Sequence, residues 1–261
     1  MFRKIKWGMV LPLILISACL GVKKDVRDVS VITSIDLGTT NTKLDQEIGM
    51  IDEYDLRASV RTKEDSGVRV QSLTVTTPSG DSFTVKRDDK GAIDKIDPKY
   101  GIEVIRGFEL NGNESVWNLA AIANKEYELF GDGTYTITAQ YENGSDQVDL
   151  WYGEPGSDDP LPFPKNNGFT NPDVSQPMTS PVTFTWDSDP IAQNISVFFA
   201  SEGKERDDSF PATTTSFGPF DYSPGIWELE LAIFVERKGI VDGVSFTISK
   251  GTVYSTEGVI K

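Results

Sequence analysis

The 261-residue sequence contains no histidine and a single cysteine, and its 25 Lys and Arg residues are outnumbered by 40 Asp and Glu residues. Without histidine there is no base for a Ser-His-Asp or Cys-His nucleophile and no imidazole ligand for zinc or iron. The single cysteine excludes an intrachain disulfide. A formal net charge of −15 disfavours nucleic acid as a partner, because phosphate binding depends on clustered Lys and Arg. We therefore expect no nucleic-acid partner and no cofactor.

The N-terminal segment has the pattern of a secretion signal. Three basic residues within the first six positions precede an apolar run over residues 7–16. This run is shorter than the roughly 20 residues of a membrane-spanning helix. It leads into LISAC at residues 15–19, where small residues stand directly before Cys19.

The LISAC segment resembles the lipobox of bacterial lipoproteins, which has an aliphatic residue three places before a cysteine and small residues between. The resemblance implies that residues 1–18 are removed and that Cys19 becomes the acylated first residue, carrying diacylglyceryl on sulfur and an acyl chain, such as palmitate, on its amine. Two or more acyl chains give stable membrane anchoring. Leu20 occupies the position where, in Gram-negative bacteria, aspartate favours inner-membrane retention, so we expect an outer-membrane, lipid-anchored protein of the cell envelope. Loss of residues 1–18 removes three basic and no acidic residues, which changes the formal charge to −18.

Runs that alternate apolar and polar residues predict half-buried antiparallel strands from about residue 53 onward, with turn residues between them. One helical turn is expected around residues 115–125. A proline-rich stretch interrupts the alternation, and proline cannot donate to a strand ladder, so we place a domain boundary there. The expected organisation is a signal peptide over residues 1–18, a flexible tether over 19–50 in which residues 29–35 could form a short strand, a first β-sandwich over 51–155, a Pro-rich linker over 156–180 and a second sandwich over 181–261.

Two segments look like versions of one another. FGDGTYTITA at residues 130–139 and YSPGIWELEL at 222–231 each place an aromatic before a glycine turn, a second aromatic after it, and then alternating apolar residues. This is similar to the tyrosine corner that leads into strand F of immunoglobulin-like and fibronectin type III domains, although the second copy carries Trp227 where tyrosine is usual. PVTFTW at 181–186 resembles the fibronectin strand with its core tryptophan. The resemblance implies an all-β fold with two immunoglobulin/fibronectin-like sandwiches in tandem.

Three aromatic residues fall on the polar side of their predicted strands. In VDLWY at residues 148–152, an inward Leu150 places Trp151 on the opposite face, and Phe198 and Phe234 likewise lie opposite the apolar stripes of their segments. Exposed aromatic faces can stack on sugar rings, so these residues are candidate ligand platforms. The alternative is that the second domain, the linker or a partner protein covers them.

Carboxylates are the remaining chemistry that the chain could use. Asp158 and Asp159 lie in the linker, and Asp187 and Asp189 follow directly after the predicted strand at 181–186. All four are weak calcium candidates, since calcium takes oxygen ligands from loops. No EF-hand spacing is present, and we assign no metal. Acidic pairs that could serve a glycosidase lie in predicted turns or on polar strand faces, so we assign no catalytic residue.

The sequence therefore favours a non-enzymatic structural, adhesion or partner-binding module held at the membrane by its lipid anchor. The alternative is a surface glycan-binding lipoprotein of a polysaccharide-uptake system, whose layout resembles that of the tandem-sandwich starch-binding lipoproteins of gut bacteria. A carboxylate-based glycoside hydrolase or lyase is a third possibility. Possible ligands are accordingly a protein or a glycan.

Overall fold

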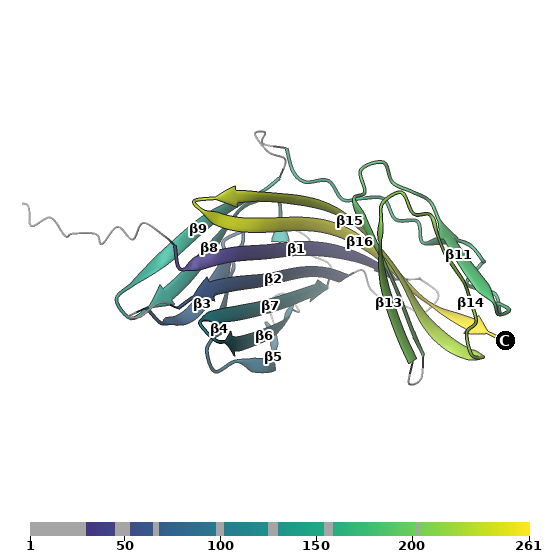
Figure 1. Ribbon diagram of the computed structural model, residues 1–261, viewed down its shortest axis with the longest axis horizontal. Helices are drawn as coiled ribbons and strands as arrows, with labels where there is room; N and C mark the ends of the chain where they lie inside the picture. Colours follow the sequence, from purple (N-terminus) through teal and green to yellow (C-terminus); the bar gives the residue numbers. More distant parts are fainter. Residues whose placement is uncertain are drawn as a thin grey trace, which may run out of the picture.

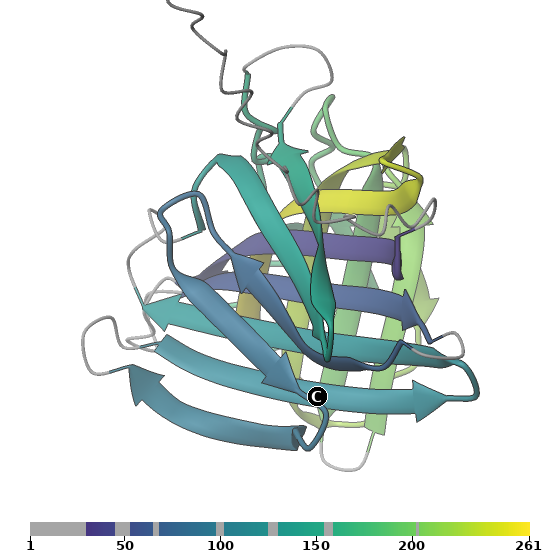
Figure 2. The same cartoon turned by 90° about the vertical axis from the view of Figure 1, so that its left-hand side faces the viewer.

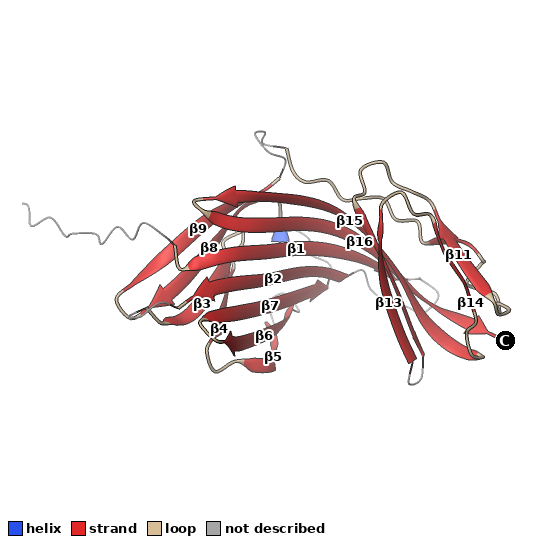
Figure 3. Ribbon diagram, in the orientation of Figure 1, coloured by secondary structure: helices blue, strands red, loops and turns tan. Residues whose placement is uncertain are grey.

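The computed structural model describes residues 30–44, 53–64, 68–97, 102–124, 130–153, 159–201 and 204–261 (Figure 1). The expected signal peptide over residues 1–18, Cys19 and Asp158 lie outside these ranges. Within them the regular structure is β-strand, and helical geometry is limited to a 3-10 position at Phe130 (Figure 3). In this described part, no helix is long and apolar enough to cross a membrane. The predicted all-β class is confirmed.

The strands form one large and two small sheets. The nine-stranded sheet has the order β13-β12-β15-β16-β1-β2-β7-β6-β5, the four-stranded sheet β4-β3-β8-β9, and the three-stranded sheet β10-β11-β14. The strands are β1 (Ile32–Leu44), β2 (Glu53–Lys63), β3 (Val70–Thr76), β4 (Ser82–Lys86), β5 (Lys90–Asp97), β6 (Ile102–Asn111), β7 (Glu114–Asn124), β8 (Gly133–Tyr141), β9 (Gly144–Tyr152), β10 (Phe169–Asn171), β11 (Val182–Trp186), β12 (Asn194–Ser201), β13 (Lys204–Pro211), β14 (Ser216–Phe220), β15 (Gly225–Val241) and β16 (Val244–Ile260).

The two small sheets lie toward opposite ends of the molecule, with the nine-stranded sheet continuous between them (Figure 1). In the view from the left-hand end, the four-stranded sheet lies in front of the large sheet, and its strands cross those behind at a steep angle (Figure 2). Strand twist accumulates at roughly 20° per strand, so the two ends of a nine-stranded sheet run in different directions. The large sheet is therefore strongly curved.

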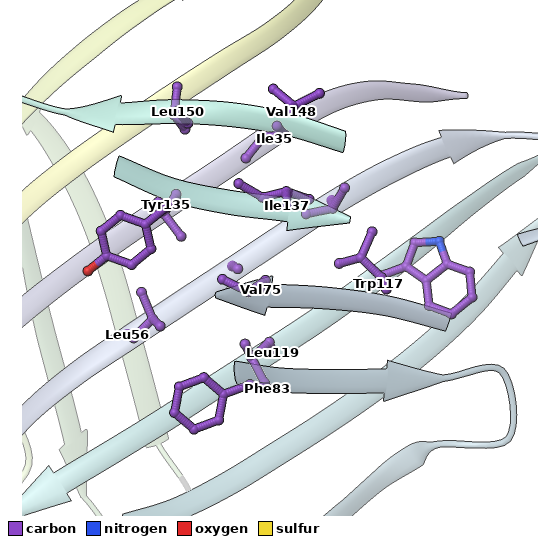
Figure 4. Close-up of a cluster of buried hydrophobic side chains, with 14 of the residues drawn as sticks. Ile35, Leu56, Val75, Phe83, Trp117, Leu119, Tyr135, Ile137, Val148 and Leu150 are labelled. Carbon is purple, nitrogen blue, oxygen red and sulfur yellow. The ribbon is translucent and has the colours of Figure 1, made fainter. Parts of the chain in front are cut away.

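The first hydrophobic core lies between the four-stranded sheet and the large sheet (Figure 4). The expected stripe of Leu56, Ala58 and Val60 on β2 faces it, as do Tyr135 and Ile137 on β8. Each of these side chains is at most 4% exposed. Because strand side chains alternate between faces, the burial confirms that the period-two reading of these segments was correct.

The second core lies under the three-stranded sheet, and the β15–β16 hairpin contributes to both cores. Leu229 and Leu231 from the first part of β15 belong to the second core. Val235, Phe246 and Ile248, further along the same hairpin, belong to the first core. The structure thus contains two cores on one large sheet, and the 156–180 connector does not divide the chain into two separately packed halves.

The segment expected to be a tether includes a central strand. β1 pairs in parallel with β16 and antiparallel with β2, and Ile35 and Leu37 are fully buried in the first core. The second half of β1 lacks the apolar pattern of a core strand because Thr39 points inward there. The backbone nitrogen and the hydroxyl oxygen of Thr39 lie 3.0 and 2.8 Å from the hydroxyl oxygen of Tyr152, so a polar contact replaces an apolar one.

The helical turn predicted at residues 115–125 is wrong, since residues 115–124 form most of β7. Trp117, Leu119, Ala121 and Ala123 alternate with polar or half-buried residues and face the first core. Alanine and leucine favour a helix locally, but pairing with β2 and β6 along the whole strand outweighs that weak preference.

Both corner segments form the same kind of hydrogen bond. The Tyr135 hydroxyl donates to the carbonyl oxygens of Phe130 at 2.5 Å and Gly131 at 3.2 Å. The Trp227 indole N–H donates to the carbonyl oxygen of Ser223 at 3.0 Å. The tryptophan therefore keeps the corner contact with a different donor.

The proline-rich connector packs against the hairpin at the junction between the cores. The side-chain amide of buried Asn166 donates to the carbonyl oxygens of Leu231 at 2.7 Å and Thr252 at 2.8 Å. The Thr252 hydroxyl donates to the carbonyl oxygen of Pro164 at 2.7 Å. Part of the connector forms β10, an edge strand of the three-stranded sheet. The connector is thus part of the folded body.

We predict that residues 181–261 do not fold alone. Without the first core, this fragment would expose Val235, Val244, Phe246 and Ile248, and each such side chain contributes roughly 1.5–3 kcal/mol on burial. Residues 30–261 should unfold in one calorimetric transition. Phe184→Ala in the second core should lower the free energy of unfolding of the whole chain by about 3–5 kcal/mol. A cooperative transition of the isolated fragment, or two separate transitions of residues 30–261, would contradict this.

Candidate functional site

A groove of about 1090 Å³ lies on the face of the nine-stranded sheet that points away from both cores. Asp36, Gly38 and Thr40 line it, and they alternate along β1 with the core residues Ile35 and Leu37. Residues of β12, β13 and β15 line it as well as residues of β2, β6 and β7. Strands from the two ends of the large sheet therefore contribute to one cavity, because the sheet curves.

Small side chains form much of the groove floor. In one row across the sheet, Ser249 on β16 is paired with Gly38 on β1, and Gly38 with Arg57 on β2, which is paired with Ala120 on β7. Three of these four side chains are small. Since these strands pair on both sides, the floor presents side chains and paired backbone rather than free backbone groups.

Phe234 on β15 lies over the backbone of Gly251, its partner on β16. A Cβ atom on Gly251 would lie 2.5 Å from the Cδ1 and Cε1 atoms of the Phe234 ring and 3.2 Å from the Cγ2 atom of Thr40. The ring therefore needs glycine beneath it. This contact supports one side of the ring, and Phe234 lines the groove.

Phe198 on β12 is the second aromatic residue that lines the groove. Its cross-strand neighbours are Asp207 on β13 and Glu230 on β15. Directly opposed residues on one sheet face have Cβ atoms about 4.5–5.5 Å apart. The aromatic side chain is thus flanked by a carboxylate on each side.

The groove is acidic. Five carboxylates and one guanidinium line it, which corresponds to a formal charge of −4. Arg57 pairs with the buried Asp55 at 3.1 Å between Nη2 and Oδ2. Glu236 pairs at 3.2 Å with Lys238, which is not among the lining residues. The lining carboxylates are those of Asp36, Asp55, Asp207, Glu230 and Glu236.

Burial raises the pKa of Glu230 above its ordinary value, and the charge of Glu228 raises it further. A hydrogen bond from Ser255 and the charge of Arg57 oppose this, and Asp55 adds a small increase. Glu230 lies on β15, whereas Arg57 and Asp55 lie on β2 with β16 and β1 between them. This coupling is consistent with β2 and β15 facing each other across the groove.

Trp151, the third candidate platform, lies outside the groove. It points away from the first core as predicted, since its neighbours Leu150 and Tyr152 are buried in that core. A Cβ atom on Gly153 would lie 2.5 Å both from the Trp151 indole nitrogen and from the carbonyl oxygen of Asp159. The start of the connector thus covers part of Trp151, in line with the alternative reading of this residue.

The calcium candidates do not converge on one another. The two carboxylate oxygens of buried Asp189 accept backbone N–H groups, from Lys165 at 2.5 Å and from Ile191 at 2.9 Å. Asp187 and Asp159 are exposed, and Asp158 is outside the described residues. Across the described ranges, no three acidic, Cys or His residues are grouped so that they could hold a metal ion.

Sequence reasoning identified Phe198 and Phe234 but missed the cavity that joins them. Asp55, Arg57 and Gly251 carry no motif, and the pairing of distant strands brings them to the same face. The only local indication was that polar and small residues alternate with core residues on β1, β2, β15 and β16. Comparison with protein-family models finds no match for the chain, and comparison with curated proteins finds no similar sequence.

We predict a pH-dependent stability difference between Glu230→Gln and the parent protein. The folded-state pKa of Glu230 is raised above its ordinary value of 4.5. The stability contributed by its protonated form is therefore complete below that value and is lost as the pH rises through the raised pKa. Glutamine resembles the protonated carboxyl, so the variant should match the parent below about pH 4.5 and be more stable at neutral pH.

Chemical denaturation across pH 3.5–8 measures this difference, with Glu142→Gln at the β8–β9 turn as a control for the loss of one carboxylate outside the groove. A stability difference that is the same at every pH would contradict the assignment.

Proposed function

We propose that the protein is a non-enzymatic, lipid-anchored binding protein of the bacterial cell envelope and that its groove binds a glycan. The observation that carries this proposal is the placement of Phe198 and Phe234 in one concave cavity, with carboxylates and hydroxyls around them. Aromatic faces bury the apolar faces of sugar rings, and convergent polar side chains bond sugar hydroxyls.

The groove suits a glycan better than an extended peptide. A peptide that adds to a sheet gains affinity from main-chain hydrogen bonds along an unpaired strand edge. The groove floor consists of interior strands such as β16, β1 and β2, each paired on both sides. A ligand that lies on this floor must therefore be held by side chains.

Attachment to the membrane through Cys19 and location in the outer membrane belong to the same proposal. The LISAC segment supports them by its resemblance to a lipobox. Likewise, we propose that the two cores are relatives of immunoglobulin or fibronectin sandwiches. The matching corner hydrogen bonds of Tyr135 and Trp227 support that relationship.

A structural or adhesion role is the second candidate. The specific observation in its favour is that the β15–β16 hairpin takes part in both cores, which makes them one body and suits a spacer or a scaffold for a partner protein. In this role the groove would bind protein rather than glycan.

Alanine substitution tests the glycan proposal. Phe234→Ala and Phe198→Ala should each weaken binding of any recognised oligosaccharide at least about fivefold, since the ring contact of a buried aromatic is worth more than about 1 kcal/mol. Trp151→Ala, outside the groove, should leave binding unchanged. Glycan-array screening of residues 30–261, followed by calorimetric titration of each variant, gives the measurement.

Binding of no glycan, or equal losses with Trp151→Ala, would contradict the proposal. Turnover of a bound oligosaccharide would contradict the non-enzymatic assignment.

The anchor has a separate test. Full-length protein expressed in a Gram-negative host should partition into the membrane fraction, because two or more acyl chains give stable anchoring. Cys19→Ala should release it into the soluble fraction or leave it as unprocessed precursor. Mass spectrometry of the N-terminal peptide should show an acylated Cys19 in the parent, and an unmodified Cys19 would contradict the assignment.

A further inference from the structure

We infer that the glycan recognised by the groove carries free amino groups, as de-N-acetylated amino-sugar oligosaccharides do. This inference rests on the proposed function and names its substrate class. Three features of the groove support an amine-bearing oligosaccharide: its charge, the position of Phe198 and the distance between the two aromatic residues.

The charge of the groove calls for a cationic ligand. Of the five lining carboxylates, Asp55 is neutralised by Arg57 at 3.1 Å and Glu236 by Lys238 at 3.2 Å. The remaining three carboxylates have no cation within salt-bridge distance among the described residues, and they are those of Asp36, Asp207 and Glu230. A neutral glycan would leave this charge uncompensated, and an anionic glycan such as a uronic acid polymer would be repelled.

Phe198 marks the place where a cation fits. The row Asp207, Phe198, Glu230 crosses β13, β12 and β15 on the groove face. An ammonium group over an aromatic ring is attracted by the negative face of the ring, and this attraction is stronger when the site is partly desolvated. Here a carboxylate stands on either side of the ring, so one ammonium can contact the ring and a carboxylate together. The half-buried position of Glu230, which raises its pKa, shows that water is partly excluded at this end.

The separation of the two aromatic residues indicates an oligosaccharide rather than a single sugar. Phe198 is paired with Glu230, and Phe234 lies four residues further along β15. At about 3.4 Å per residue this places the two side chains roughly 14 Å apart along the strand. Phe234, supported by Gly251, has no carboxylate among its direct cross-strand partners, which are Asn194 and Gly251. Phe234 therefore suits the apolar face of a sugar ring, and Phe198 suits the amine-bearing sugar.

A lysine-rich peptide is the competing cationic ligand. It would satisfy the carboxylates, but it has no ring to stack on Phe234 and no unpaired strand to join on the groove floor. The experiment below separates the two ligands.

The test is calorimetric titration of residues 30–261 with three probes: a fully de-N-acetylated glucosamine hexamer, the N-acetylglucosamine hexamer of the same length, and hexalysine. The pH is set where the glucosamine amines are protonated. We expect the de-N-acetylated hexamer to bind at least tenfold more tightly than the acetylated one, the amount that one partly desolvated cation–π and carboxylate contact provides.

Variants then locate the contact. The double variant Asp207→Asn, Glu230→Gln should abolish the preference for the amine and leave the weaker binding of the acetylated hexamer in place. Glu142→Gln, outside the groove, is the matched control and should change neither affinity. Gly251→Ala should weaken both hexamers, because the added Cβ displaces the Phe234 ring. Thermal unfolding of each variant confirms that it is folded.

The possible failures are distinguishable. If both hexamers bind equally and Phe234→Ala abolishes their binding, the proposed function stands and the amine inference is wrong. If neither hexamer binds but a neutral glycan from the array does, the proposed function again stands and the amine inference is wrong. If no glycan binds, both are wrong. If hexalysine binds as tightly as the de-N-acetylated hexamer and Phe234→Ala does not affect either, the groove recognises charge alone and the glycan assignment is overturned.

Discussion

The β15–β16 hairpin contributes side chains to both hydrophobic cores and to the groove. Its two 17-residue strands pair without interruption from Gly225 and Ile260 to Val241 and Val244. Because side chains alternate strictly along a strand, an unbroken hairpin presents the same face along its whole length. One face supplies both cores, under the three-stranded sheet at one end and the four-stranded sheet at the other. The opposite face remains continuous and becomes the centre of the groove.

Two cores on one sheet leave a junction that neither small sheet covers, and polar contacts fill it. Lys250 is 1% exposed there, and its ammonium group pairs with Asp132 and lies 4.7 Å from the centre of the Phe163 ring. Burial lowers the pKa of Lys250, and the bond to Asp132 opposes the change. Asn166 of the connector bonds the carbonyl oxygens of β15 and β16 beside it. A buried ion pair contributes little net stability, but it disfavours arrangements that leave either charge unpaired.

Small residues leave space for the groove in the sheet face, and large aromatic and charged side chains supply the groups that can contact a ligand. Glycine in a strand loses packing, and an aromatic side chain on the neighbouring strand can cover the gap. Phe234 over Gly251 is such a pair. Phe246 and its cross-strand partner Gly239 form a second, on the core side, where the Phe246 ring lies against the position that a Cβ atom on Gly239 would take. On the core side the ring is buried, whereas on the groove side one ring face stays available to a ligand. The same packing device therefore has a structural result on one face and a binding result on the other.

The amino-acid pattern was enough to predict the all-β class, the inward stripes of most strands, the turns between them, the corner segments and the outward placement of Phe198, Phe234 and Trp151. These follow from period-two alternation and turn chemistry, which are local. Local patterns failed where tertiary contacts replaced them: in β1, where Thr39 meets Tyr152, and in β7, whose alanines pack in a sheet. Which strands become neighbours is a long-range property, because β1 pairs with β16 more than 200 residues away. No local pattern could therefore predict that the two cores share one sheet, or that Asp55, Glu230 and Phe234 line the same groove.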